Sequence, residues 1–69
     1  MNVEQLSRCA GVDPVTPEVM QEKGLIKKIG AVKILGAGEL KESLNVHAHK
    51  FSGSAQKKIE NSGGKAVNL

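Results

Sequence analysis

Apolar residues recur along this chain at two spacings, every second position in some segments and every third or fourth in others. In residues 44–48 the apolar positions alternate, which places Leu44, Val46 and Ala48 on one face and predicts a half-buried strand. Three further short apolar runs predict strands at residues 2–6, 31–35 and 65–69. The pattern therefore predicts short strands spread along the whole chain.

A first short helix is predicted by its capping residues rather than by a long apolar stripe. Thr16 suits the N-cap, Pro17 suits the first helical position, and Gly24 suits the position after the last turn. Val15 before the cap and Met20 after it are spaced as a hydrophobic staple. A helix of barely two turns is marginal in water, so its apolar residues must pack against the rest of the domain.

A second helix is predicted directly after the only aromatic residue of the chain. Ser52 is the expected N-cap, and Ala55 and Ile59, four residues apart, give the helix a narrow apolar stripe. Gly63 ends it. Phe51 precedes the cap, and we expect this one large aromatic ring to insert into the core.

Two glycines separate the strand predicted at residues 31–35 from the strand at residues 44–48. Gly36 and Gly38 would allow a tight hairpin turn with a positive φ angle at one or both positions. They also look like the start of a dinucleotide fingerprint, but Lys41 occupies the place of the third glycine, and a strand follows where that motif needs a helix. We therefore expect a hairpin and no nucleotide cofactor.

The length and composition of the chain restrict what it can be. At 69 residues it has room for one small domain, and a domain of this size buries only about 60% of the surface that its unfolded chain exposes. The single Cys9 cannot form an internal disulfide and is expected to be a half-buried small apolar side chain. No segment has the pattern of a secretory leader or a membrane span, which favours a reducing, soluble compartment. Trp and Tyr are absent, which excludes base-stacking RNA binders of the RRM and OB types.

Charge divides the chain into an acidic part and a longer basic part. Residues 1–22 hold one arginine and four acidic residues, for a net charge of −3, whereas residues 23–69 hold nine lysines and three acidic residues, for a net charge of +6. A surface rich in lysine attracts phosphates. Composition by itself, however, favours the simpler interpretation of a solvated lysine-rich surface.

The residue pattern gives little support to catalysis or metal binding. His47 and His49 lie two apart on one strand face and could reach one zinc ion, but only Cys9 or Glu42 could join them, at unsuitable spacing. No carboxylate pair or Ser/His/Asp order assembles an active site. We therefore expect no enzyme, no cofactor, no metal site and no small-molecule substrate.

One group of polar residues suits phosphate binding. Ser52 and Ser54 lie at the start of the second predicted helix, where free backbone N–H groups favour anions. Lys50, Lys57 and Lys58 flank them, with the two helix lysines expected on the solvent side. The bland alternative is that Ser52 only caps the helix and that the lysines only solvate its surface.

A longer pattern over residues 33–63 gives these observations one context. Its positions of restricted type are Lys33, Ile34, Leu35, Gly36, Gly38, Leu40, Leu44, Val46, Phe51, Ser52, Ala55, Ile59 and Gly63. The order and spacing of these residues resemble the signature of the large-subunit ribosomal protein fifteen family, of the bacterial or organellar type. Residues 15–28 and 63–67 resemble adjoining parts of the same family's C-terminal globular half.

The resemblance implies a fold and a domain. The fold is α+β, a small mixed domain of short strands and two short helices arranged in irregular strand-strand-helix units, and it takes up residues 1–69. The N-terminal half of the family is an extended arm rich in Gly, Arg and Lys, and nothing in these residues resembles that arm.

The resemblance also implies a structural constituent of the large ribosomal subunit, in the cytoplasm or in an organelle. Its expected partners are large-subunit ribosomal RNA and neighbouring ribosomal proteins, with no membrane. The alternative is a small basic protein-interaction domain with no specific RNA role. The residues expected to contact RNA are Lys27, Lys28, Lys33, His47, His49, Lys50, Ser52, Ser54, Lys57 and Lys58.

Overall fold

Three short helices and four short strands surround one apolar core in the computed structural model of the chain, which describes residues 1–69. In chain order the elements are the 3-10 helix η1 (Val3–Cys9), α1 (Pro17–Glu22), β1 (Lys33–Ile34), β2 (Asn45–Ala48), β3 (Lys50–Phe51), α2 (Gly53–Asn61) and β4 (Lys65–Asn68). This content confirms the predicted α+β class. None of the helices has the length and apolar character that a membrane crossing requires.

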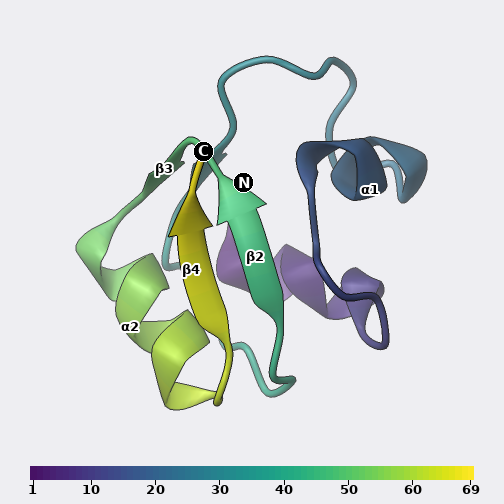
Figure 1. Cartoon of the computed structure of the whole chain (residues 1–69). Coiled ribbons are helices and arrows are strands. Elements are labelled where there is room, and N and C mark those ends of the chain that lie inside the picture. The colour runs from purple at the N-terminus through teal and green to yellow at the C-terminus, as the bar shows by residue number, and fades with distance from the viewer.

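The strands form two small parallel sheets, of which Figure 1 shows the β2–β4 sheet. β1 pairs with β3, and β2 pairs with β4, with α2 as part of the crossover from β2 to β4. Each sheet gains one bridge from the N-terminal part of the chain, because Asn2 pairs with Leu35 after β1 and Val15 pairs with Val46 of β2. The acidic first third of the chain is thereby joined to both sheets.

The hairpin predicted around Gly36 and Gly38 is wrong, because β1 and β2 are not paired. Both sheets are parallel, so the chain must leave the sheet after β1 instead of folding back along it. Gly38 has a φ angle of +81°, as expected for one of the two glycines, whereas Gly36 has no positive φ. Gly36 is needed for space, since a Cβ there would overlap Ser54 Oγ and lie 2.8 Å from the backbone nitrogen of Ala55.

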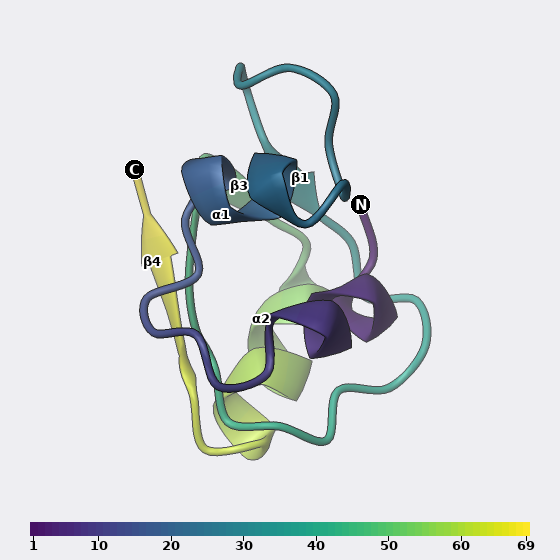
Figure 2. The same ribbon diagram turned by 90° about the vertical axis from the view of Figure 1, so that its right-hand side faces the viewer.

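The strand predicted at residues 2–6 is also wrong, because Val3–Cys9 form the 3-10 helix η1. Val3, Leu6 and Cys9 are spaced three apart, which aligns them on one face of a 3-10 helix, and all three are fully buried. η1 packs against α2 (Figure 2). The N-terminal segment therefore covers the core with a helix face and contributes only one bridge to a sheet.

Both predicted helix starts are confirmed. Thr16 Oγ1 accepts a hydrogen bond from the N–H of Val19 at 3.3 Å, at the start of α1. Ser52 Oγ accepts one from the N–H of Ala55 at 3.2 Å, at the start of α2. Each helix is followed, after its C-cap residue, by a glycine with positive φ, as predicted.

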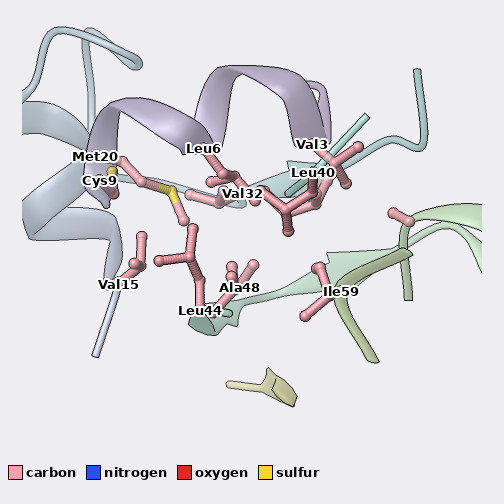
Figure 3. Close-up of a cluster of buried hydrophobic side chains, with 13 residues drawn as sticks. Val3, Leu6, Cys9, Val15, Met20, Val32, Leu40, Leu44, Ala48 and Ile59 are labelled. Carbon is pink, nitrogen blue, oxygen red and sulfur yellow. The ribbon is translucent and has the colours of Figure 1, made fainter. Parts of the chain in front are cut away.

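Thirteen buried apolar side chains form the core (Figure 3). They come from η1, α1, α2, β1, β2 and the segments between them, and the predicted inner face of residues 44–48 is among them. The side chains are those of Val3, Leu6, Cys9, Val15, Met20, Val32, Ile34, Leu40, Leu44, Val46, Ala48, Ala55 and Ile59. Almost all of these side chains are aliphatic and none is aromatic, so each contributes little buried area and the core depends on close packing.

Phe51 packs against this core but is not fully buried, which corrects the predicted insertion of its ring. In the register of β1 and β3 it lies beside Ile34, which is fully buried. Part of the ring stays in solvent because β3 is at the margin of the core. Truncation of Phe51 should therefore cost less than the roughly 3–5 kcal/mol typical of a buried phenylalanine.

Cys9 is fully buried rather than half-buried. Burial raises the pKa of its thiol, and the positive charge of Lys23 acts in the opposite direction with a smaller effect. The thiol is therefore protonated at neutral pH and serves as a small apolar side chain.

The close approach of two backbone segments predicts a large effect of Gly64→Ala. A Cβ at this position would overlap the Leu44 carbonyl oxygen and lie 2.7 Å from the Leu44 backbone nitrogen, so the variant should lose about 1–3 kcal/mol of unfolding free energy or more. Gly53→Ala is the matched control, because nothing lies within 4 Å of a Cβ there. Urea unfolding measures both variants, and equal midpoints would contradict the backbone contact.

Candidate nucleic-acid interface

The residues predicted to contact RNA lie in four parts of the structure. The loop between α1 and β1 carries two of them, the β1–β3 sheet and the bend before β3 carry three, β2 carries one, and α2 with its N-cap carries four. In that order they are Lys27 and Lys28, then Lys33, His49 and Lys50, then His47, then Ser52, Ser54, Lys57 and Lys58.

Lys27 and Lys28 are exposed on a loop that stands away from the body of the molecule (Figures 1 and 2). Gln21 of α1 holds this loop, since its Nε2 donates a hydrogen bond to the Lys27 carbonyl oxygen at 3.1 Å. The backbone is thus attached at Lys27 while both ammonium groups face solvent. Both side chains are therefore accessible to a binding partner.

Lys33 and Lys50 are direct partners in the register of β1 and β3. Residues in register across a parallel pair project to the same face, and the next pair, Ile34 and Phe51, packs against the core. Both lysines are exposed. Sequence reasoning identified each lysine but not their adjacency, because it paired β1 with β2.

The His49 side chain forms a hydrogen bond to the backbone at one end of the β1–β3 ladder. The His49 backbone N–H donates to the Val32 carbonyl oxygen at 3.0 Å, and its Nδ1 accepts the Val32 N–H at 2.9 Å. Because Nδ1 accepts, the proton of the neutral ring lies on Nε2, and this atom is the donor left for a partner. His47 is half-buried within β2. No group of three or more His, Cys, Asp or Glu side chains is placed to hold a metal ion.

The start of α2 is partly covered by the segment that follows β1. Ser52 Oγ caps the helix and lies 3.3 Å from Ser54 Oγ. The Gly36 backbone packs against Ser54 and the first turn of the helix. The Ser52 hydroxyl thus serves as the predicted cap, and the approach of Gly36 leaves less of the first helical turn open to a phosphate than the sequence suggested.

Lys58 is tied into the fold, which corrects its predicted place on the solvent side of the helix. Its Nζ donates hydrogen bonds to the carbonyl oxygens of Gly36 at 2.6 Å and Gly38 at 2.5 Å, and the residue is only partly exposed. Lys57, in contrast, is exposed. The Lys58 ammonium group thus fixes the glycine segment on α2.

A shallow groove of about 440 Å³ lies beside this contact and was not predicted. It is formed by the segment before β2 and the C-terminal end of α2. Its lining residues are Glu39, Leu40, Lys41, Lys58, Asn61 and Ser62. Since only one of them is apolar, the groove lacks the apolar lining typical of small-molecule sites. No local sequence signal could have found it, because only the fold brings the two segments together.

Comparison with known proteins identifies a family and relatives with similar sequences. The model of the family described as ribosomal proteins 50S-L15 and 50S-L18e, together with their 60S counterpart, matches residues 1–67. The large ribosomal subunit protein uL15 of Bdellovibrio bacteriovorus is 60% identical over 65 residues, which cover 94% of this chain and 43% of that protein. The protein of the same name from Thermosipho africanus is 57% identical over 68 residues, which cover 96% of this chain and 46% of that protein.

These matches confirm the family resemblance found in residues 33–63. The relatives are ribosomal proteins, so the expectation that the chain is not an enzyme is confirmed as well. The chain spans a little under half the length of these two relatives and corresponds to their C-terminal part.

The Lys58 contact predicts a difference between two neighbouring lysines. Lys58→Met keeps most of the apolar stem but leaves the Gly36 and Gly38 carbonyl oxygens without their charged donor, and should lower the unfolding free energy by about 1–2 kcal/mol. Lys57→Met, on the exposed side, should change it by less than about 0.5 kcal/mol. Thermal and urea unfolding of both variants test this, and similar stabilities would show that the Lys58 bonds contribute nothing.

The His49 ring predicts a local effect that hydrogen exchange can detect. His49→Ala removes the acceptor of the Val32 N–H, so exchange at this amide should become faster and stability should fall by about 1 kcal/mol. His49→Asn places a carbonyl oxygen near the position of Nδ1 and should retain much of the protection. If both variants exchange like the parent chain, the ring does not hold the end of the ladder.

Proposed function

Because the chain belongs to the family of ribosomal proteins 50S-L15 and 50S-L18e, we propose that it is a structural constituent of the large ribosomal subunit that binds ribosomal RNA through its lysine-rich surface. Its place is then the cytoplasm of a bacterium or the interior of an organelle with ribosomes of the same type. The single domain of residues 1–69 would be the globular part that such a protein contributes.

The observation that carries this proposal is the set of exposed lysines in the basic part of the chain. Five of the predicted contact residues are lysines with exposed side chains, on the projecting loop, on the β1–β3 sheet and on α2. They are Lys27, Lys28, Lys33, Lys50 and Lys57. Lysines at the surface of a chain with net charge +3 supply the attraction to phosphates on which RNA binding depends.

The surface has few aromatic rings, which limits how it can contact RNA. Phe51 is the only Phe, Tyr or Trp residue, and its ring packs against the core, so the surface lacks the set of exposed aromatic rings on which base-stacking RNA binders depend. Lysine ammonium groups and the His49 Nε2 are suited to phosphate oxygens. We therefore propose that the domain recognises the backbone and shape of folded RNA rather than its base sequence.

Neighbouring ribosomal proteins are proposed partners for a different surface. β4 pairs with β2 on one side only, and its other edge is open. Val67 and Leu69 on this strand and just beyond it are 37% and 59% exposed, although both are large and apolar. An open strand edge with apolar side chains suits contact with a protein. The same observation favours the second candidate function, a small basic protein-interaction domain.

The salt dependence of RNA binding separates the two functions. If the exposed lysines contact phosphates, the affinity for large-subunit RNA should fall linearly with the logarithm of salt concentration, and Ala at Lys27, Lys28 or Lys57 should each reduce the slope by about one unit. Arg8→Ala, which removes one charge from the acidic first third of the chain, is the matched control and should leave the slope nearly unchanged. A weak affinity that does not vary with salt would support the protein-interaction domain instead.

A further inference from the structure

The β1–β3 sheet places two like charges side by side, at Lys33 and Lys50. The two residues lie opposite each other in a sheet whose strands have only two residues each. Adjacent strands are about 4.8 Å apart, so the two side chains start from neighbouring points on one exposed face. Like charges directly opposite in a sheet destabilise it.

The fold leaves the two lysines little freedom to separate at their base. Ser52 donates its backbone N–H to the Ile34 carbonyl oxygen at 2.9 Å, and His49 donates to Val32 at 3.0 Å, so the ladder is closed on both sides of the pair. β1 is also held from its other side, where Leu35 donates to the Met1 carbonyl oxygen at 2.7 Å. Only the flexible stems can move the ammonium groups apart.

Nothing in the chain neutralises this pair. The hydrogen bonds that lysine ammonium groups make within the chain are those of Lys58, at a different site. The titratable residue directly before β3 is His49, whose Nδ1 accepts the Val32 N–H and whose Nε2 can only donate. The paired strands β1 and β3 lie at the end of the molecule from which the loop between α1 and β1 extends (Figure 2). An anion from outside is therefore the group that would relieve the repulsion.

We propose that Lys33 and Lys50 together bind one phosphate of the ribosomal RNA backbone, and that the free chain tolerates their repulsion because the bound phosphate removes it. The proposal rests on the proposed function and assigns one two-lysine site within it. RNA is favoured over an acidic peptide because the relatives of the chain are ribosomal proteins and because lysine is a common phosphate ligand, which it binds as a point charge.

A double-mutant cycle on the 69-residue chain tests whether the two lysines share one phosphate. Lys33→Met and Lys50→Met should each weaken binding of large-subunit RNA by about three- to tenfold at moderate salt, and the double variant should lose clearly less than the product of the two losses. Lys27→Met and Lys57→Met, on the loop and on α2, form the control cycle and should be additive. An additive Lys33/Lys50 cycle would overturn the shared site.

Thermal unfolding without RNA gives a second, independent readout. At low salt each single Met variant should melt at or above the temperature of the parent chain, because one of two repelling charges is gone. Inorganic phosphate should raise the melting temperature of the parent chain and have less effect on either variant. Variants that melt well below the parent would overturn the proposed repulsion.

The two readouts also separate this site from the function on which it rests. If RNA binds tightly but both Met variants bind it like the parent chain, the function stands and the site is wrong. If RNA does not bind while phosphate stabilises only the parent chain, the assignment to RNA is overturned. A third outcome is that RNA does not bind, whereas polyglutamate does, with the same less-than-additive losses in the Lys33/Lys50 cycle. This outcome would identify an acidic protein as the partner instead.

Discussion

The attachment of the Gly36–Gly38 segment to α2 is the contact on which the rest of this structure depends. β1 ends at this segment, and β3, the partner of β1, leads directly into α2. The Lys58 ammonium group binds the Gly36 and Gly38 carbonyl oxygens, and Gly36 packs against the first turn of the helix. β1, β3 and α2 therefore form one closed unit. Because α2 also leads into β4, the same attachment relates the β1–β3 sheet to the β2–β4 sheet.

This attachment explains why residues 36 and 38 are glycines, although no hairpin forms there. Gly36 is required because a side chain would collide with α2, and Gly38 because the chain turns there through a positive φ. A similar approach recurs where Gly64 meets the backbone of Leu44, next to the β2–β4 sheet. With only thirteen side chains in its core, nearly all aliphatic, the domain gains cohesion where its backbone segments touch. Small residues at these points are therefore part of the packing.

The sequence predicted the features that depend on neighbouring residues, such as helix caps and strand faces. It did not predict the features that depend on residues far apart in the chain, such as strand pairing. The caps at Thr16 and Ser52 and the inner face of residues 44–48 depend on neighbours within a few positions, and the structure has them as expected. Strand pairing, in contrast, does not depend on sequence neighbours alone. The alternation of apolar and polar residues over two to four positions is the same in a hairpin and in a parallel crossover. The nearest strand in sequence was a reasonable partner for β1, but burial of Ile34 beside Phe51 requires β3.

The candidate interface was predictable to the same degree. Exposed lysines such as Lys27 and Lys57 follow from composition and helix phase, whereas Lys58 could not be separated from Lys57 because its acceptors are backbone atoms some twenty residues away.

One register determines both the core and the charged face of the β1–β3 sheet. The pairing that turns Ile34 and Phe51 toward the core necessarily turns Lys33 and Lys50 outward as neighbours, since adjacent residues of a strand project to opposite faces. A shift by one residue would expose the apolar pair and bury the lysines. Packing therefore selects a register that electrostatics in the free chain would not favour. The repulsion between the two lysines follows from forming the core, and an external phosphate can offset it without any change in the fold.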